Sequence, residues 1–340
     1  MPCLVRPVGS TPSLGDPLVD EYLRFTAARV RANTLTAQAF DLKVFFTVVP
    51  KAPQQVTVTD VLLFIEAQRA PRRGGNVIRL ADGEAGLAAS TIKRRLATVS
   101  SLFDYLFLRG ICDRNPVPRS LGARHARPDG RGHGGRRGAP LVRAPRKLPR
   151  VLAPAEVGAL TGALRTDRDR AMVALMVHGG LRRCEVLGLR FEHVQVGDRR
   201  VFVADGKGGH QRLVPVADVF FTTLASYLSG ERPAEAVDDH VFVVLKGPNR
   251  GRPLTAAGLD EVMAGARGRA GLSHASCHEL RHTCFTRLRE AGMALEAIQA
   301  QAGHASIETT RVYLHLSNDW LAGEYQRAMA ILDGLHEEEQ

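Results

Sequence analysis

The sequence is poor in features that several classes of protein need. Its five cysteines are odd in number and form no Cys-x-x-Cys pair, which argues against a disulfide framework and a zinc site. The most apolar stretch, 171–181, is too short to span a membrane. The N-terminus lacks the basic and apolar segments of a secretory signal, and no glycine-rich stretch has the form of a nucleotide-binding P-loop. These absences favour a protein of a reducing cytoplasm that holds no metal.

Positive charge, in contrast, is abundant. The 340 residues include 46 Lys and Arg against 35 Asp and Glu, a net charge of +11. This balance favours a polyanionic partner, either nucleic acid or an acidic membrane surface. Ten of the basic residues and one acidic residue fall in 119–150, a stretch rich in glycine and proline, so we predict a basic linker over 116–150. Two interpretations of it stay open, a solvated tether or a strap along a phosphate backbone.

Hydrophobic periodicity predicts a helical domain over 17–115, after a tail at 1–16. The expected helices cover 17–31, a segment from Asn33 or Thr34, a segment from Thr59, and a segment from Ser90 to Gly110. A Gly- and Arg-rich insert interrupts this pattern at 71–89. The first half of the chain is therefore expected to be a four-helix unit.

The second half of the chain, 151–333, has a mixed pattern and is followed by an acidic tail at 334–340. A capping box at Thr166 predicts a helix that ends at Gly179. The other predicted elements are strands at 201–204 and 212–216, a turn-rich hairpin at 205–210 and a last amphipathic helix at 319–333. The expected fold class is mainly α with a small antiparallel β-sheet.

Five places in the sequence could support chemistry. They supply Arg182 at a helix start, Lys207 at the hairpin tip, the pair His278 and Arg281, His304 at the end of a short helix, and Tyr313. Taken singly, most have a more ordinary explanation, such as a solvated lysine or a tyrosine in a core. The pair is more specific, because Ser276-Cys-His-Glu279 has the form of a capping box and places His278 and Arg281 on one face beside the positive end of a helix. That face suits the binding of a phosphate in a reaction that transfers a proton. His282 is predicted to point elsewhere on the helix and to be structural.

Together these places match one family. The matching segments are Gly-Leu-Arg-x-x-Glu-Val at 180–186, Gly-Lys-Gly-Gly at 206–209, His-x-Leu-Arg-His-Thr at 278–283, Gly-His at 303–304 and Thr-Thr-x-x-Tyr-x-His at 309–315. In the residues of these segments and in their order, the sequence strongly resembles the tyrosine recombinase (phage integrase) family. The resemblance covers 151–330 by motif and 17–115 only by its helical layout. Cys184, Phe285 and Ala302 depart from the family's usual residues, but none of them is a reacting group.

The resemblance implies an enzyme that recombines DNA at specific sites by phosphoryl transfer, without a metal or other cofactor. The implied catalytic residues are Arg182, Lys207, His278, Arg281, His304 and the nucleophile Tyr313. Tyr313 would form a 3′-phosphotyrosyl link, the two arginines would hold the phosphate oxygens, and Lys207 would protonate the leaving 5′-oxygen. His278 would accept the tyrosine proton or bind the phosphate, and His304 would bind the phosphate or align the tyrosine.

The resemblance also implies how the protein meets its partners. Two domains joined by the basic linker would form a C-shaped clamp around a DNA duplex that carries a short inverted repeat. The expected DNA contacts are Lys93, Arg94, Arg95, Arg136, Arg137, Arg146, Lys147 and Arg150, although spacing alone makes the first three a solvated face. The helix at 319–333 would dock into a neighbouring subunit and give a homotetramer, with or without a second recombinase.

Several alternatives remain open at this point. A type IB topoisomerase would use the same chemistry without strand exchange, and a catalytically silent DNA-binding protein would have lost it. Among recombinases, the insert at 71–89 and the long linker favour integration or transposition of a mobile element, with resolution of chromosome dimers by an Xer-type enzyme as the alternative. The Ala-, Arg-, Gly- and Val-rich composition suggests a bacterium with a GC-rich genome, and so a protein of the cytoplasm that acts at the nucleoid.

Overall fold

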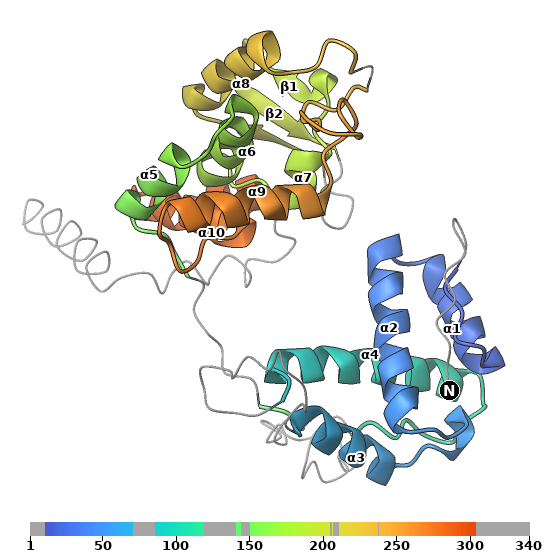
Figure 1. Cartoon of the computed structure of the whole chain (residues 1–340). Helices are drawn as coiled ribbons and strands as arrows, with labels where there is room; N and C mark the ends of the chain where they lie inside the picture. Colours follow the sequence, from blue (N-terminus) through green and yellow to red (C-terminus); the bar gives the residue numbers. More distant parts are fainter. Residues whose placement is uncertain are drawn as a thin grey trace, which may run out of the picture. The chain divides into compact units, whose positions relative to one another are not determined.

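The computed structural model of the chain describes residues 11–70, 86–118, 141–143, 150–204, 206, 211–236 and 238–303 (Figure 1). The chain divides into two compact units, Met1–Arg146 and Lys147–Gln340. Within the described residues, no helix is both long enough and apolar enough to cross a membrane.

The first unit is helical, as the hydrophobic pattern predicted. Its elements are α1 (Pro17–Ala27), α2 (Ala32–Val48), the 3₁₀ turn η1 (Pro53–Gln55), α3 (Val58–Arg69) and α4 (Ala89–Leu108). Asp16 caps α1 by accepting hydrogen bonds from the N–H groups of the first turn, and Thr57 and Asp60 form a capping box on α3. Two predicted helix boundaries are wrong. The helix α1 ends at Ala27 rather than near residue 31, and α2 begins after Arg31, without the side-chain cap expected from Asn33 or Thr34.

Aromatic rings fill the centre of the first unit. Phe45 of α2 lies edge-to-face against Phe64 of α3, with 5.1 Å between ring centres, and against Phe103 of α4, with 6.4 Å. All three side chains are fully buried. Edge-to-face pairs add a specific attraction to the burial of apolar area, so these rings fix how α2, α3 and α4 pack (Figure 1).

Part of the predicted linker is packed. Val117 and Val142 are 7% and 3% exposed and belong to the hydrophobic cluster of the first unit. Asn115 helps to hold this segment, since its side-chain amide donates to the Ser100 carbonyl at 2.9 Å. The described parts of 116–150 near these valines are therefore not an extended tether, because burying their apolar side chains on the helices removes them from water.

The second unit mixes helices with a small sheet. Its elements are α5 (Pro154–Gly162), α6 (Asp167–His178), α7 (Arg183–Leu187), η2 (Phe191–His193), β1 (Val194–Gln195), β2 (Arg200–Val203), β3 (Arg212–Pro215), α8 (Asp218–Gly230), α9 (Ala256–Arg269), α10 (Cys277–Glu290) and α11 (Leu295–Ala302). The strands form one antiparallel sheet in the order β1-β2-β3, with Val201 of β2 opposite Val194 and Val214. The predicted fold class, mainly α with a small antiparallel sheet, is confirmed, and the predicted strands are β2 and β3 to within a residue. The two-residue strand β1 was not predicted.

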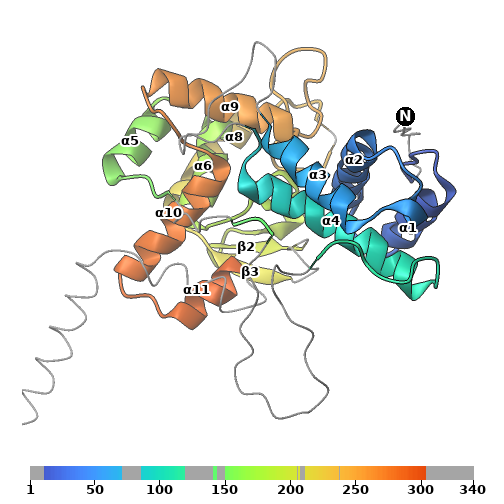
Figure 2. The same ribbon diagram turned by 90° about the horizontal axis from the view of Figure 1, so that it is seen from below.

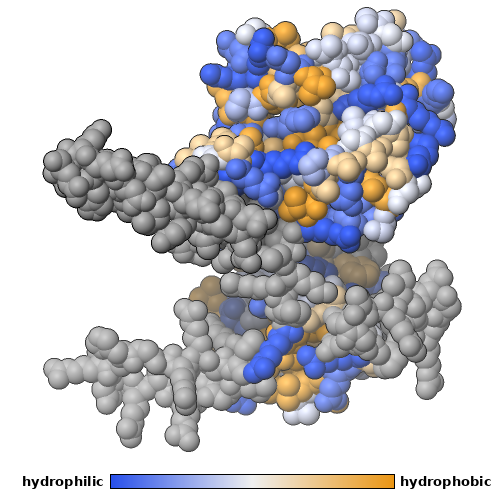
Figure 3. Space-filling view, turned by 90° about the vertical axis from the view of Figure 1, so that its left-hand side faces the viewer, coloured by the Kyte–Doolittle hydropathy of each residue, from blue (hydrophilic) through white to orange (hydrophobic). Residues whose placement is uncertain are grey.

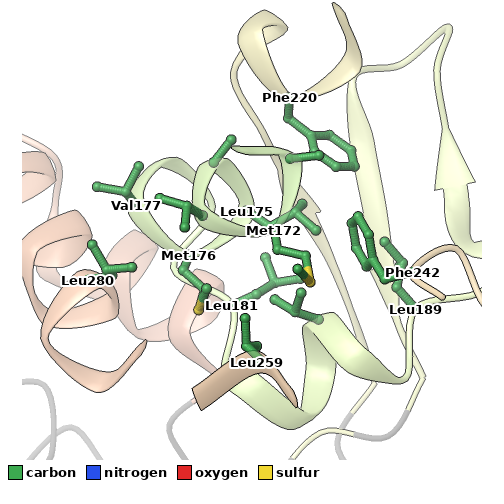
Figure 4. Close-up of a cluster of buried hydrophobic side chains, with 14 of the residues drawn as sticks. Met172, Leu175, Met176, Val177, Leu181, Leu189, Phe220, Phe242, Leu259 and Leu280 are labelled. Atoms are coloured by element: carbon green, nitrogen blue, oxygen red, sulfur yellow. The ribbon is translucent and has the colours of Figure 1, made fainter. Parts of the chain in front are cut away.

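The helix α6 forms the centre of the second unit. Thr166 caps it as predicted, by accepting from the Asp169 N–H at 3.2 Å. The reciprocal half of the predicted box is missing, because the Asp169 carboxylate instead accepts from Arg168. Every residue in 171–177 is buried, since α8, α9 and α10 contribute Phe220, Leu259 and Leu280 around it (Figure 4).

The face of the second unit that Figure 3 shows is mostly hydrophilic. In the space-filling view, its small hydrophobic areas are separated by hydrophilic side chains (Figure 3). At another edge of the same unit, α11 lies beside β3 (Figure 2). That contact brings the end of α11 close to the strand that follows the predicted hairpin tip.

Candidate active site

The start of α10 positions two of the predicted catalytic residues. The predicted capping box is present, because the Ser276 N–H donates to Glu279 Oε2 at 2.7 Å and the Glu279 N–H donates to Ser276 Oγ at 3.3 Å. This box fixes the first turn of the helix. His278 lies in that turn and Arg281 follows three residues later, so both lie on one face of α10.

Arg281 is held inside the second unit. It is only 3% exposed, and its guanidinium donates to the Gly180 carbonyl and, at 2.7 Å, to the Ala302 carbonyl. It also lies over the Phe285 ring, 4.8 Å from the centre. Gly180 has a φ of +67°, and a Cβ at this position would overlap the Phe285 ring, so the bend that offers this carbonyl requires glycine.

Arg182 lies at the start of α7, as predicted, with 20% of its side chain exposed. Its backbone N–H donates to Glu185 Oε2 at 2.8 Å, and its guanidinium donates to Glu185 Oε1 at 2.7 Å. The other terminal nitrogen reaches the Gly303 carbonyl at 3.4 Å. Glu185 therefore both caps α7 and orients the Arg182 side chain.

The Glu185 carboxylate joins the two predicted arginines to a third. Its side chain is fully buried, and it accepts two hydrogen bonds from Arg212 of β3, at 3.0 and 2.8 Å. The Arg281 guanidinium approaches it to 3.9 Å. Burial raises the pKa of Glu185, but hydrogen bonds from Arg212 and Arg182 outweigh that effect and hold the pKa below its usual value. In this set of four side chains, three guanidinium groups thus surround one ionised carboxylate.

The last turn of α11 completes this arrangement. Three consecutive carbonyls there each accept a hydrogen bond from a different arginine. The pairs are Arg212 Nε to Gln301 at 2.8 Å, Arg281 to Ala302 at 2.7 Å and Arg182 to Gly303 at 3.4 Å. Carbonyls at the end of a helix carry partial negative charge, so they attract all three guanidinium groups to one place.

Sequence reasoning missed Glu185, Arg212 and Gln301. A signal for Glu185 was present, because it stands three residues after Arg182 at the start of a helix, the spacing of a capping box. Arg212 gives no such signal, since it meets Glu185 from 27 residues away. The contact between Arg212 and Gln301 spans 89 residues and depends on how α11 packs on β3.

His282 is not where the sequence predicted. We expected it to point away from His278, but their Nε2 atoms lie 2.8 Å apart and their ring centres 4.2 Å apart. The reason is the helical repeat, which stacks residues i and i+4. Burial, with the nearby His278 and Arg281, lowers the pKa of His282 to about 4. Desolvation, then the charge of Arg281, also lowers the pKa of His278, so both rings are neutral at pH 7 and one donates to the other.

The six predicted catalytic residues divide into two groups. The structure brings Arg182, His278 and Arg281 together, since Arg182 and Arg281 share Glu185 and both act on the pKa of His278. Lys207, His304 and Tyr313 lie outside the described residues, as does the helix predicted at 319–333.

The predicted DNA contacts differ in how exposed their side chains are. Lys93 and Arg94 are exposed on α4, and Arg150 is exposed at the start of the second unit. Arg95 is 6% exposed and donates to Gln68 of α3, so the solvated face expected for the trio on α4 is wrong for this residue. Arg136, Arg137, Arg146 and Lys147 lie outside the described residues.

The chemistry available to this cluster is the binding of an anion. Guanidinium groups match the geometry of phosphate oxygens, and a neutral imidazole beside them can take or give a proton. Among the residues that the structure describes, no group of three or more His, Cys, Asp or Glu side chains is placed to hold a metal ion.

The chain is similar to known recombinases along most of its length. The phage integrase family model matches residues 150–319. A tyrosine recombinase XerC from Serratia marcescens is 28% identical over 93% of this chain and 95% of its own length. A tyrosine recombinase XerC from Roseiflexus castenholzii is 30% identical over 88% of this chain and 89% of its own length. A structure of the Tn1549 transposon integrase, at 18% identity, has a TM-score of 0.65 over 91% of this chain and 97% of its own.

A helical unit, a mixed unit with a three-stranded sheet and a cluster of arginines with histidine define a class of DNA strand-transfer enzymes. The chain belongs to the phage integrase family, the tyrosine recombinases. It is a site-specific recombinase that cleaves and rejoins DNA.

Proposed function

We propose that the chain recombines double-stranded DNA through a covalent intermediate in which Tyr313 is joined to a 3′-phosphate. The observation that carries this proposal is the convergence of Arg182 and Arg281 on Glu185 and the end of α11, with His278 beside them. The two arginines would bind the non-bridging oxygens of one phosphate.

In the proposed step, the Tyr313 Oη attacks phosphorus and the bond from phosphorus to O5′ breaks. The tyrosine proton passes to His278, because a tyrosine with an ordinary pKa of about 10 needs a base at neutral pH. Lys207 gives a proton to the leaving O5′, and His304 binds the phosphate or aligns the tyrosine. A 5′-hydroxyl from a partner strand then reverses the step, so that the bond energy is kept in the intermediate and no nucleotide is consumed.

The two arginines stabilise the transition state. A pentacoordinate phosphorus gains negative charge on its non-bridging oxygens, and Arg182 and Arg281 supply forked donors that meet that charge. Both guanidinium groups are already held in place by Glu185 or by backbone carbonyls, so little reorganisation is needed when the phosphate arrives.

The partner in this proposal is a duplex with a short inverted repeat. Its phosphates would contact exposed basic residues of both units. The proposed DNA contacts are Lys93, Arg94, Arg136, Arg137, Arg146, Lys147 and Arg150; Arg95 would act only by supporting α4. Four copies of the chain would assemble on two such sites through the helix at 319–333, with two subunits active at a time.

Two biological roles fit this activity. Integration or transposition of a mobile element was favoured by the insert at 71–89, and a transposon integrase has the same fold. Resolution of chromosome dimers is the second candidate, favoured by the match to XerC recombinases along nearly the whole chain. In either role the protein would act on bacterial DNA in the cytoplasm.

Trapping on DNA tests this function. The purified protein is incubated with DNA fragments from its own genomic neighbourhood, SDS is added, and the covalently attached DNA is sequenced, with Tyr313→Phe in parallel. Attached fragments that share an inverted repeat, and that are lost in the variant, support the proposal and reveal the site. Attachment without shared sequence would indicate a topoisomerase, and ordinary binding without attachment would indicate a silent DNA-binding protein.

A further inference from the structure

Arg212 has no role in the proposed chemistry, yet each of its three side-chain nitrogens makes a hydrogen bond at the site. It is the first residue of β3, and its side chain is only 8% exposed. Its two terminal nitrogens donate one to each oxygen of Glu185, and its Nε donates to the Gln301 carbonyl. A buried arginine that uses three of its nitrogens on two other elements has little freedom to move.

We propose that Arg212 is a positioning residue, which fixes Glu185 and the last turn of α11 so that Arg182 and Arg281 face one scissile phosphate. This inference rests on the proposed function, since the phosphate is the ligand that the two arginines share. Arg212 itself would not touch the phosphate, because its nitrogens bond to Glu185 and Gln301.

Arg212 limits how the Glu185 carboxylate can turn. With both oxygens engaged by Arg212, this carboxylate makes a single side-chain hydrogen bond to Arg182 and stays 3.9 Å from Arg281. Without Arg212 it could turn to pair with either of them through both oxygens, the geometry that carboxylates and guanidinium groups prefer. Such a pair would compete with the phosphate for the same donors.

Arg212 also holds the last turn of α11. Arg212 packs so closely on the end of this helix that a Cβ at Gly303 would lie 3.1–3.2 Å from its side chain. Gly303 ends the helix in the left-handed conformation, with φ +60°. The neighbouring carbonyl of Ala302 holds Arg281, and His304 is the next residue in the sequence. Moving the helix end would therefore displace Arg281.

The test needs a control residue that makes the same kinds of bonds but only stabilises the fold. The second unit offers one. Arg168 is also buried in the second unit, donates twice to a carboxylate, that of Asp169, and once to a carbonyl, that of Val243. It lies on α6, and its side-chain hydrogen bonds within the described part of the chain go to Asp169 and Val243 rather than to the arginine cluster. Arg168→Met thus removes an equivalent set of bonds away from the site.

The experiment measures single-turnover cleavage of a nicked duplex that carries the trapped site. One substrate has an ordinary scissile phosphate and the other a methylphosphonate, which lacks one charged oxygen and so depends less on the arginines. Wild type, Arg212→Met, Arg212→Lys and Arg168→Met are compared at equal amounts of bound DNA, with thermal unfolding as a check of folding. Lysine keeps the charge, but its single nitrogen cannot reproduce the planar fork that donates in parallel to both Glu185 oxygens and also to the Gln301 carbonyl.

We expect Arg212→Met to cleave the phosphate about 100-fold more slowly than wild type, the effect of a misplacement of roughly an ångström, with DNA affinity unchanged. Its loss on the methylphosphonate should be much smaller, and Arg212→Lys should fall between Arg212→Met and wild type on the phosphate. Arg168→Met should keep the wild-type ratio between the two substrates.

Two results would overturn the inference, and they are distinguishable. If wild type forms no more covalent complex than Tyr313→Phe, the proposed function fails and the inference fails with it. If wild type cleaves but Arg212→Met slows both substrates equally, as Arg168→Met does, Arg212 is only structural. Should Arg212→Met not fold, the ratio for Arg212→Lys decides the question: an unchanged ratio contradicts the inference.

Discussion

Both units of this recombinase bury one carboxylate among arginines, but the arginines are arranged differently. In the first unit, Asp41 of α2 is fully buried and accepts from Arg94 and Thr98 of α4, while Arg95 donates to Gln68. These contacts join side chains of neighbouring helices. They explain how α2, α3 and α4 are held together without defining a site for a ligand.

In the second unit, the arginines around Glu185 also bind a second element. Arg182, Arg212 and Arg281 each bond to a carbonyl in the last turn of α11 as well. His278 lies beside them on an exposed turn of helix. A buried ion pair alone therefore does not mark a functional site; several guanidinium groups converging on helix-end carbonyls next to a neutral imidazole do.

The largest difference is expected between Arg281→Met and Arg95→Met, two buried arginines of the two units. Arg281→Met should slow covalent cleavage by about 100- to 1,000-fold, as for the loss of one oxyanion donor. Arg95 Nε also lies 3.7 Å from the buried Asp41 carboxylate, so Arg95→Met should lower the free energy of unfolding of the first unit by about 3 kcal/mol, as for a broken buried pair. It should leave the cleavage rate of bound complexes unchanged. Single-turnover trapping and hydrogen exchange in α2 and α4 measure the two effects. Equal cleavage rates for the two variants would contradict the comparison.

A smaller effect is expected from the second imidazole of α10. Because the pKa of His282 falls from about 6.5 when unfolded to about 4 when folded, the unfolded chain takes up a proton between these values that the folded chain does not. Stability should therefore rise with pH from about 4 to about 6.5 and be independent of this group above that range. His282→Gln should flatten that part of the curve of Tm against pH. An unchanged slope would show that the ring is not held neutral by its surroundings.

The smallest effect is expected at exposed basic residues. Lys93→Gln and Arg150→Gln should each weaken DNA binding and lower the slope of log Kd against log salt by about 0.9, the value for one phosphate contact. Arg95→Met should leave the slope unchanged, because this side chain is buried against Gln68. Titrations at several salt concentrations measure this. A slope that Lys93→Gln and Arg150→Gln leave unchanged would place the DNA elsewhere.

Local patterns explain what the sequence could predict. The capping box of Ser276 and Glu279 is a contact within four residues, so it placed His278 and Arg281 correctly. The fold class followed in the same way from hydrophobic periodicity. The contacts of Arg212 with Glu185 and Gln301 were not predictable, because they depend on the packing of α7, β3 and α11.

The misreading of His282 has a different origin. It stands four residues after His278, a spacing that stacks two side chains on one face of a helix, so this contact was predictable from the sequence. The burial of Arg95 did not follow from its basic neighbours, because consecutive residues point in different directions around a helix and so do not share one face.

The measurement that tests the central claim most directly is mass spectrometry of the DNA-linked peptide. The trapped complex is digested with nuclease and protease, and the tyrosine that carries the remaining nucleotide is identified among the five of the chain. We expect attachment at Tyr313 alone, through a 3′-phosphate, with a sharply reduced yield in Arg281→Met. Attachment at Tyr325 or another residue, or a yield that Arg281→Met leaves unchanged, would contradict the proposed roles of Tyr313 and Arg281.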